Sequence, residues 1–288
     1  RGFAGSCCTR TQVSSPVSDF SSLAERCDRR STFEVGRHAR LELAFACRNG
    51  RTVMRDAYAE PPFRIGRTFD VDGAAYVIIV SSGPGVFAGD RLHQVVSVAR
   101  GARVLLASQS ALQVHPSEAE EPAHVQQEFR VEDGGELHCQ WDPIIPFADA
   151  RVVQRVDVRL SSGSRLYWSD ALMSGRSSRG EAWKFRELVH QLRLRVDGSL
   201  QYLERYHLKL GDRPVRHSWI AGRADYLGTS LVYHDAATSL AAERLQREVD
   251  LVDGVRAGVD LVEPRLIVGR LLAGRGAPFA RARAVFRS

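Results

Sequence analysis

The sequence predicts a mainly β fold in which strands and hairpins stack into a helical β arrangement, with a few covering helices near the C-terminus. From residue 36 onward, apolar and polar residues alternate with a period of two, which suits half-buried strands and cannot form a helical stripe. Short turns containing glycine separate these segments. The turn glycines Gly73, Gly101, Gly135, Gly163 and Gly198 are 28, 34, 28 and 35 residues apart, a spacing expected of successive strand pairs.

The N-terminal segment differs from the rest of the chain. The 288 residues are 44% hydrophobic and 26% charged, as in ordinary globular proteins, and allow one or two domains. Residues 1–35 are rich in Ser, Thr and Arg and have no periodic apolar pattern. We therefore expect a disordered leader over residues 1–35 and one β domain over residues 36–288.

The cysteine pattern and the lack of a long apolar segment indicate in which cellular compartment to expect the protein. The five cysteines are odd in number and form no C-x-x-C pair, so neither a disulfide framework nor a zinc site is expected. No segment approaches the roughly 20 apolar residues of a spanning helix, and the leader has no apolar run of the secretory type. We expect a cytoplasmic protein without membrane contact.

Six turns predict the hairpins. The clearest case joins alternating residues 129–131 and 137–141 through Asp133-Gly134-Gly135. Similar turns occur at Ser161-Ser162-Gly163 and Asp197-Gly198, with weaker copies at Asn49-Gly50, Asp72-Gly73 and Arg100-Gly101. Each turn is predicted to connect two paired antiparallel strands.

The pattern changes after His234. Ala241, Leu245 and Val249 recur every four residues within 238–252, which predicts one amphipathic helix. A second helix is predicted over about residues 277–286, and residues 261–272 remain ambiguous. We expect both helices to cover an open face of the β structure.

Motifs for catalysis and for nucleotide or nucleic-acid binding fail on their chemistry. The glycine-rich loop 82–91 has no Lys-Ser/Thr pair after its last glycine. Asp90 follows that glycine and would repel phosphate, so a structural turn is expected. Ser177 lies in a segment that resembles the nucleophile elbow of serine hydrolases. The segment has one residue too many between Ser177 and the second glycine, and it does not lie between a strand and a helix. The nine histidines show no metal-ligand spacing, and the arginines lack the aromatic interleaving of a nucleic-acid surface.

Three segments, in order along the chain, resemble the urease accessory protein family UreD, also called UreH. They are the glycine-rich stretch SSGPGVFAGDRL (81–92), the segment LHCQWDPIIPFADA (137–150), and the pairs Gly175-Arg176 and Gly180-Glu181. The intervening LLASQSALQVH (105–115) keeps Gln109 but has Gln113 where the family commonly has a lysine. The tail 266–272 also resembles the family's closing motif, and the resemblance spans roughly residues 36–287.

This resemblance implies a nonenzymatic scaffold for urease maturation. It implies a mostly β, helically arranged fold and a bridge from apo-urease to the helical partner UreF and the GTPase UreG. Nickel in transit, with no tightly bound cofactor, would travel through an internal passage to the urease active site. An arginine-rich surface suits such protein partners, because only Lys184 and Lys209 are lysines among 40 basic residues.

Carboxylates inside the family-like motifs are the candidate nickel ligands, because a conduit needs oxygen ligands that release the ion again. They are Asp90, Asp142, Asp149 and Glu181. Gly89, Arg91, Gln109, Arg176 and Gly180 are the accompanying motif positions, assigned to partner contact or to structure. An Arg176–Glu181 pair that only holds a loop is the alternative to a transport role.

Two other functional classes stay open. A hydrolase on a β scaffold would turn over esters or amides without partners. A stand-alone ligand-binding β module would be functional alone.

Overall fold

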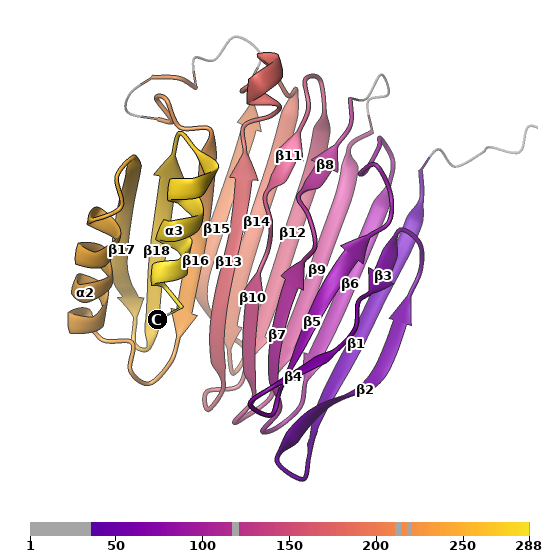
Figure 1. Ribbon diagram of the computed structural model, residues 1–288, viewed down its shortest axis with the longest axis vertical. Helices are drawn as coiled ribbons and strands as arrows, with labels where there is room; N and C mark the ends of the chain where they lie inside the picture. Colours follow the sequence, from indigo (N-terminus) through magenta and orange to yellow (C-terminus); the bar gives the residue numbers. More distant parts are fainter. Residues whose placement is uncertain (1–35, 117–120, 211–214, 218–219, 288) are drawn as a thin grey trace, which may run out of the picture. The chain divides into compact units, whose positions relative to one another are not determined.

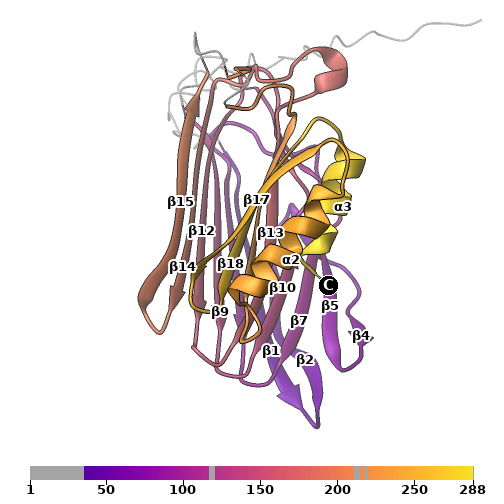
Figure 2. The same cartoon turned by 90° about the vertical axis from the view of Figure 1, so that its left-hand side faces the viewer.

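The computed structural model describes residues 36–116, 121–210, 215–217 and 220–287, which belong to one compact unit. The predicted leader, residues 1–35, lies outside the described residues. Two β-sheets pack face to face, and Figure 2 shows these layers edge-on with both α-helices on one side. The mainly β architecture predicted from the alternating pattern is confirmed.

The smaller layer, sheet A, has the strand order β15-β14-β12-β9-β6-β1-β2. Its strands are β1 (His38–Arg48), β2 (Arg51–Ala59), β6 (Arg91–Val98), β9 (Ala123–Val131), β12 (Arg151–Leu160), β14 (Glu187–Val196) and β15 (Ser199–Lys209).

The larger layer, sheet B, has the main order β17-β18-β16-β13-β10-β7-β5-β3. Off this order, β4 pairs with β5, β11 pairs with β13, and β8 pairs with β11. Its strands are β3 (Phe63–Ile65), β4 (Phe69–Val71), β5 (Ala74–Ser81), β7 (Arg103–Ser108), β8 (Leu112–Val114), β10 (Glu136–Gln140), β11 (Ile144–Pro146), β13 (Arg165–Met173), β16 (Tyr226–Tyr233), β17 (Val255–Glu263) and β18 (Leu266–Ala273).

Between β5 and β14 the chain alternates between the two sheets, and Figure 1 shows the resulting coil of strands. Strands β1, β6, β9, β12 and β14 pair in parallel within sheet A, as β5, β7, β10 and β13 do within sheet B. Parallel neighbours need a long crossover. Here each crossover passes through at least one strand of the opposite sheet, which gives the predicted helical stacking.

Three of the predicted hairpins are wrong. The turns at Arg100-Gly101, Asp133-Gly134-Gly135 and Ser161-Ser162-Gly163 connect strands of different sheets, so β6–β7, β9–β10 and β12–β13 do not pair. The turns at Asn49-Gly50, Asp72-Gly73 and Asp197-Gly198 do join antiparallel strands, as predicted. Alternation reports one buried face per strand and does not distinguish a hairpin partner from a strand facing it across the core.

Both predicted helices are confirmed. Helix α2 (Ser239–Asp250) begins after Thr238, whose hydroxyl accepts from the Ala241 N–H at 3.2 Å. Helix α3 (Gly276–Val285) packs on sheet B beside it, and a short 3₁₀ helix, η1 (Ser177–Arg179), lies in a connecting loop. The ambiguous residues 261–272 fall mostly in the antiparallel pair β17 and β18. No described helix has the length and apolar character needed to cross a bilayer.

Two apolar cores hold these layers together. The main core lies between the sheets and includes the fully buried Phe45, Phe129 and Trp168. The second lies between sheet B and the helices. There the rings of Phe279 and Phe286 pack over glycines: a Cβ on Gly228 would lie 2.6 Å from Phe279, and one on Gly269 would lie 2.1 Å from Phe286. The glycines therefore let α3 approach the sheet closely.

We expect Gly269→Ala to lower the free energy of unfolding by about 1–3 kcal/mol, because the new methyl group must displace the buried Phe286 ring. Gly258→Ala on the neighbouring β17 is the matched control, since a Cβ added at Gly258 would have no atom within 4 Å. Urea denaturation of both variants measures the difference. Equal stabilities would contradict a close packing of α3 on β18.

Candidate functional site

The family-like segments meet at one end of the two-layered unit. The Phe87 ring stacks on His115 with centroids 4.4 Å apart, and His115 meets the edge of Phe147 at 5.0 Å. The Arg176 guanidinium lies 3.9 Å above the Phe147 ring. We call Phe87, His115, Phe147 and Arg176 the motif stack. It joins the glycine-rich loop, the 105–115 segment, the 137–150 segment and the Gly-Arg pair in one contact chain.

Asp90 is buried and holds the glycine-rich loop. Its Oδ1 accepts from the Arg37 backbone N–H at 2.7 Å, and its Oδ2 accepts from the Phe87 N–H at 3.0 Å. The Arg37 guanidinium lies 3.7 Å away. Gly89 has a positive φ of 76°, and its carbonyl lies where a side chain on Gly36 would sit. As predicted, loop 82–91 is a turn between two strands.

Glu181 is committed to an ion pair. Arg176 donates to it through Nε at 2.7 Å and Nη2 at 2.6 Å, and the Ala148 N–H is 3.5 Å from Oε2. The hydrogen bonds from Arg176 lower the pKa of the Glu181 carboxyl below its ordinary value. Gly180 closes η1 in the left-handed conformation. The 175–181 loop is thereby fixed against the 142–150 segment.

The other predicted positions have different surroundings. Asp142 is exposed, and its N–H donates to Ser108 Oγ at 2.8 Å. Asp149 is exposed, has a positive φ and lies 4.0 Å from Arg186. Arg91 pairs with Glu121 at 2.8 Å, while the Gln109 N–H donates to the Ile79 carbonyl at 3.0 Å. The four candidate carboxylates do not form one cluster. Among the described residues, no group of three or more His, Cys, Asp or Glu side chains is arranged to hold a metal ion.

A row of polar side chains crosses the otherwise apolar inner face of sheet A. Gln127 donates to Gln94 at 2.8 Å, Gln154 donates to Gln127 at 3.3 Å, and His190 Nδ1 lies 2.9 Å from Gln154 Oε1. The His190 ring stacks on Tyr206 with centroids 4.7 Å apart. We call these five residues the polar band. They come from the neighbouring strands β6, β9, β12, β14 and β15.

Asp170 on the inner face of sheet B lies between two cavities. The first is lined by Gly83–Gly85, Asp142, Asp170 and the three glutamines of the polar band. Its lining residues Gly83, Pro84, Ser110 and Asp142 are exposed, which marks its opening beside the motif stack. The second cavity is lined by Asp170, Glu204, Tyr206 and Arg270. The shared Asp170 makes the two cavities neighbours along one internal polar path.

Two buried carboxyl groups line this path. Asp170 accepts from Trp168 Nε1 at 3.2 Å. Glu204 is also buried, accepts from the Thr229 hydroxyl at 2.9 Å and lies 3.2 Å from Arg270. Burial, reinforced by the charge of Glu204, raises the pKa of the Asp170 carboxyl above its ordinary value. An ionised Asp170 is therefore costly unless a cation approaches it.

Sequence reasoning missed the polar band, Asp170 and Glu204. The sequence does mark these residues: each is polar at a position where the alternating pattern predicts an apolar side chain that points inward. Gln94 between Leu92 and Val96, and Asp170 between Trp168 and Leu172, both have this pattern. Of the predicted carboxylates, Asp142 is the one that lines a cavity of this path.

The raised pKa of Asp170 predicts a pH-dependent stability difference for Asp170→Asn. The native state binds this proton more tightly than the unfolded chain, so wild-type stability falls as pH rises from about 4 to the raised pKa. We expect Asp170→Asn to be more stable, with an advantage that grows by up to about 1.4 kcal/mol per pH unit and then levels off. Urea denaturation between pH 4 and pH 8 measures it. Exposed Asp260→Asn is the control, and an advantage that does not change with pH would contradict the assignment.

Comparison with known proteins gives a consistent result. Residues 37–287 match the family model described as UreD urease accessory protein. A urease accessory protein UreD of Lysinibacillus sphaericus is 28% identical over 244 residues, which cover 83% of this chain and 90% of the relative. The UreD of Sorangium cellulosum is 35% identical, covering 71% of this chain and 64% of the relative, and UreD 2 of Streptomyces griseus is 32% identical, covering 70% and 68%.

Proposed function

Because the chain belongs to the UreD family of urease accessory proteins, we propose that it is a nonenzymatic scaffold that bridges apo-urease to UreF and UreG and passes nickel into urease. The names of the relatives support a role in urease maturation. On this proposal it works in the cytoplasm, holds nickel only in transit and needs no tightly bound cofactor.

The internal polar path is the observation that carries the transport part of the proposal. It runs from exposed Asp142, past Gln94, Gln127 and Gln154, to the buried Asp170 and on to Glu204. Three buried polar atoms beside it, Ser81 Oγ, Trp141 Nε1 and His190 Nε2, have no hydrogen-bond partner within the described protein. Buried polar groups without partners are costly. A hydrated cation in the path would offer them one.

The ligand chemistry of this path suits a divalent borderline metal. Carboxylate, amide and imidazole groups can each bind nickel, and the affinity of a site depends on how many of them converge. Here they are spread over several strands, which favours sequential weak contacts. A dication beside Asp170 favours the ionised form of this carboxyl, which can then hold the ion in the low-dielectric interior. Glu204 is already paired with Arg270 and offers a second, weaker contact.

Asp90 and Glu181 enter the same proposal as gating residues. Asp90 holds the loop whose Gly83–Gly85 portion lines the first cavity, and Glu181 holds Arg176 over the motif stack. Both act on the mouth of the path through the loops that they fix. Asp149 remains a proposed accessory carboxylate at the exposed surface nearby.

The central test uses Asp170→Asn in the accessory complex with its cognate UreF-like and UreG-like proteins and apo-urease. We expect the complex to assemble normally and nickel delivery, measured as urease activity and bound nickel, to fall on the order of tenfold. The amide lacks the Coulomb attraction between the Asp170 carboxylate and the nickel ion. For unit charges 4 Å apart at an effective dielectric constant of about 20, this attraction is worth about 4 kcal/mol before desolvation is counted. Asp260→Asn, which makes the same change on exposed β17, should deliver nickel normally.

Unchanged urease activation by Asp170→Asn would contradict transport along this path. Activation of urease without this protein would contradict the scaffold role itself. Turnover of esters or amides by the purified chain would instead favour the hydrolase alternative, and ligand binding that needs no partner would favour the stand-alone module.

We further expect Asp90→Asn and Glu181→Gln to keep their partners and to deliver less nickel. Each amide retains the size of the side chain and weakens the charge-assisted contacts that fix the mouth loops. Size-exclusion chromatography of the complex and urease activation distinguish the outcomes. Loss of complex formation would assign both residues to structure alone.

A further inference from the structure

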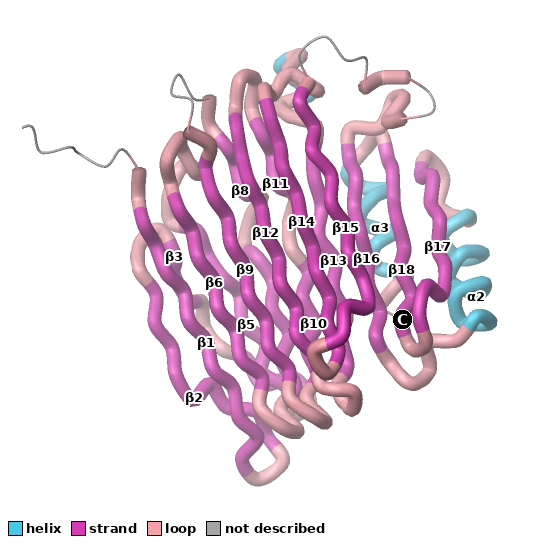
Figure 3. The backbone as a smooth tube through the Cα atoms, turned by 180° about the vertical axis from the view of Figure 1, so that it is seen from behind, coloured by secondary structure: helices cyan, strands magenta, loops and turns pink. Residues whose placement is uncertain are grey.

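The outer face of sheet A carries an excess of arginine on the side formed by β9, β12, β14 and the edge strand β15. Figure 3 shows this sheet from behind, and neither α-helix covers that face. Outward positions on β9, β12, β14 and β15 hold Arg130, Arg155, Arg159, Arg193, Arg195 and Arg205. Only two acidic side chains, Glu128 and Asp157, stand among them on these described strands, apart from Glu187 at the start of β14.

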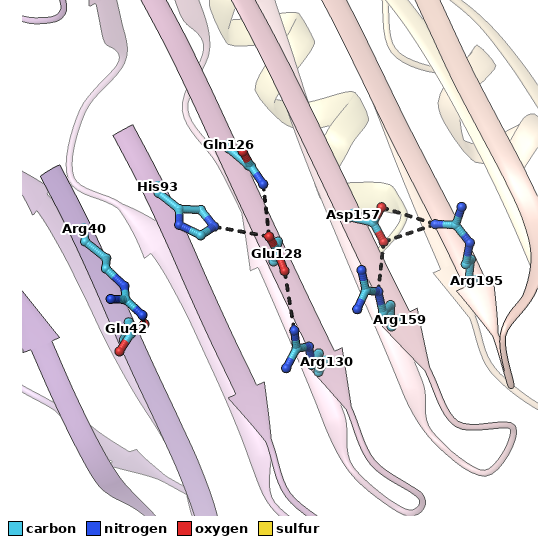
Figure 4. Close-up of polar contacts among 9 residues, drawn as sticks. All are labelled: Arg40, Glu42, His93, Gln126, Glu128, Arg130, Asp157, Arg159 and Arg195. Carbon is cyan, nitrogen blue, oxygen red and sulfur yellow. Dashed lines mark hydrogen bonds and ion pairs between the residues drawn. The ribbon is translucent and has the colours of Figure 1, made fainter. Parts of the chain in front are cut away.

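One carboxylate forms ion pairs with three of these arginines. Asp157 lies 3.2 Å from Arg159 Nε, 3.2 Å from Arg195 Nη1 and 4.0 Å from Arg193 Nη1, as Figure 4 shows for the first two. Glu128 is shared between His93 at 3.2 Å and Arg130 at 3.6 Å. The local charges therefore do not balance, and a net positive field remains.

The register makes this arrangement costly for the isolated protein. Arg130, Arg159 and Arg195 are direct partners across β9, β12 and β14. Like charges that face each other on adjacent strands destabilise a sheet. Arg155 and Arg205 are exposed and have no carboxylate partner among the described residues. If this face only stabilised the fold, acidic residues in the row of Arg130, Arg159 and Arg195 would make the protein more stable.

We propose that the outer face of β9, β12, β14 and β15 docks an acidic protein surface, one that presents Asp and Glu side chains to these arginines. A shallow hollow is lined by Arg155, Arg159 and Arg193 together with Glu128 and Asp157, so its arginines outnumber its carboxylates. The guanidinium of Arg155 and the amides of Gln126 and Gln191 offer donors to an incoming carboxylate. The flat sheet suits a protein surface. The occupant is sought among apo-urease and the accessory partners, so this part rests on the proposed function.

A nucleic acid is disfavoured as the occupant. The outward positions of β9, β12 and β14 hold no Phe, Tyr or Trp on which bases could stack. A uniform polyanion would also run over Glu128 and Asp157, whereas separate carboxylates of a protein surface can approach Arg155 and Arg205 alone.

The test is the double variant Arg155→Glu/Arg205→Glu, which removes two arginines without breaking an ion pair within the described protein. Its affinity for immobilised apo-urease, UreF-like protein and UreG-like protein is measured separately at 50 and 300 mM salt. We expect roughly a 10- to 100-fold loss with one of them, because like charges would then oppose each other across the interface. For the wild type, binding to that partner should weaken with salt.

Arg64→Glu/Arg281→Glu makes the same change of charge at exposed positions elsewhere and should bind normally. Arg155→Lys/Arg205→Lys should restore most of the affinity. Equal losses in both charge-reversed variants, or no loss in either, would overturn the docking surface. Loss of binding only to a 20-base-pair DNA duplex would overturn it in favour of a nucleic acid. Urease activation by the wild type, measured in parallel, reports separately on the proposed function.

Discussion

The rest of this structure depends on one constraint: the chain alternates between the two sheets, and the strands within each sheet are then held in parallel register. Each strand of sheet A reaches its parallel neighbour only by way of a strand in sheet B, so side chains at one level align across many strands. A polar residue at the same level on successive strands then forms a continuous row. Outside, Arg130, Arg159 and Arg195 form such a row. Inside, the polar band consists of two: Gln94 is in register with Gln127, and Gln154, His190 and Tyr206 are in register two residues away along the strands.

The same constraint explains why segments far apart in sequence meet at one end. Every second loop between successive strands lies at that end of the sandwich, and the loops of neighbouring strands lie side by side. Phe87, His115, Phe147 and Arg176 come from four such segments and stack in order. Their contacts, together with the pairs made by Asp90 and Glu181, hold the loops around the opening of the first cavity. The motifs thus build the entrance, and residues outside them line the interior.

The alternating pattern was sufficient for the fold class and the turn positions. The four-residue recurrence of Ala241, Leu245 and Val249 was sufficient for helix α2, because the face of a helix is a local feature. The alternating pattern was insufficient for pairing, because Phe129 and Leu137 point into the same core whether their strands pair or face each other. The internal site was harder still. Gln127 and Asp170 are single exceptions in separate strands, and only the register of both sheets shows that they share a path.

We propose that a nickel ion travels between the two sheets through the space beside Asp170. Anomalous diffraction at the nickel edge, on crystals of the nickel-loaded complex with its partners, tests this route. We expect a nickel peak in the interior, within coordination distance of Asp170 or Glu204. Nickel bound only at the outer surface, with no interior peak at saturating metal, would contradict it.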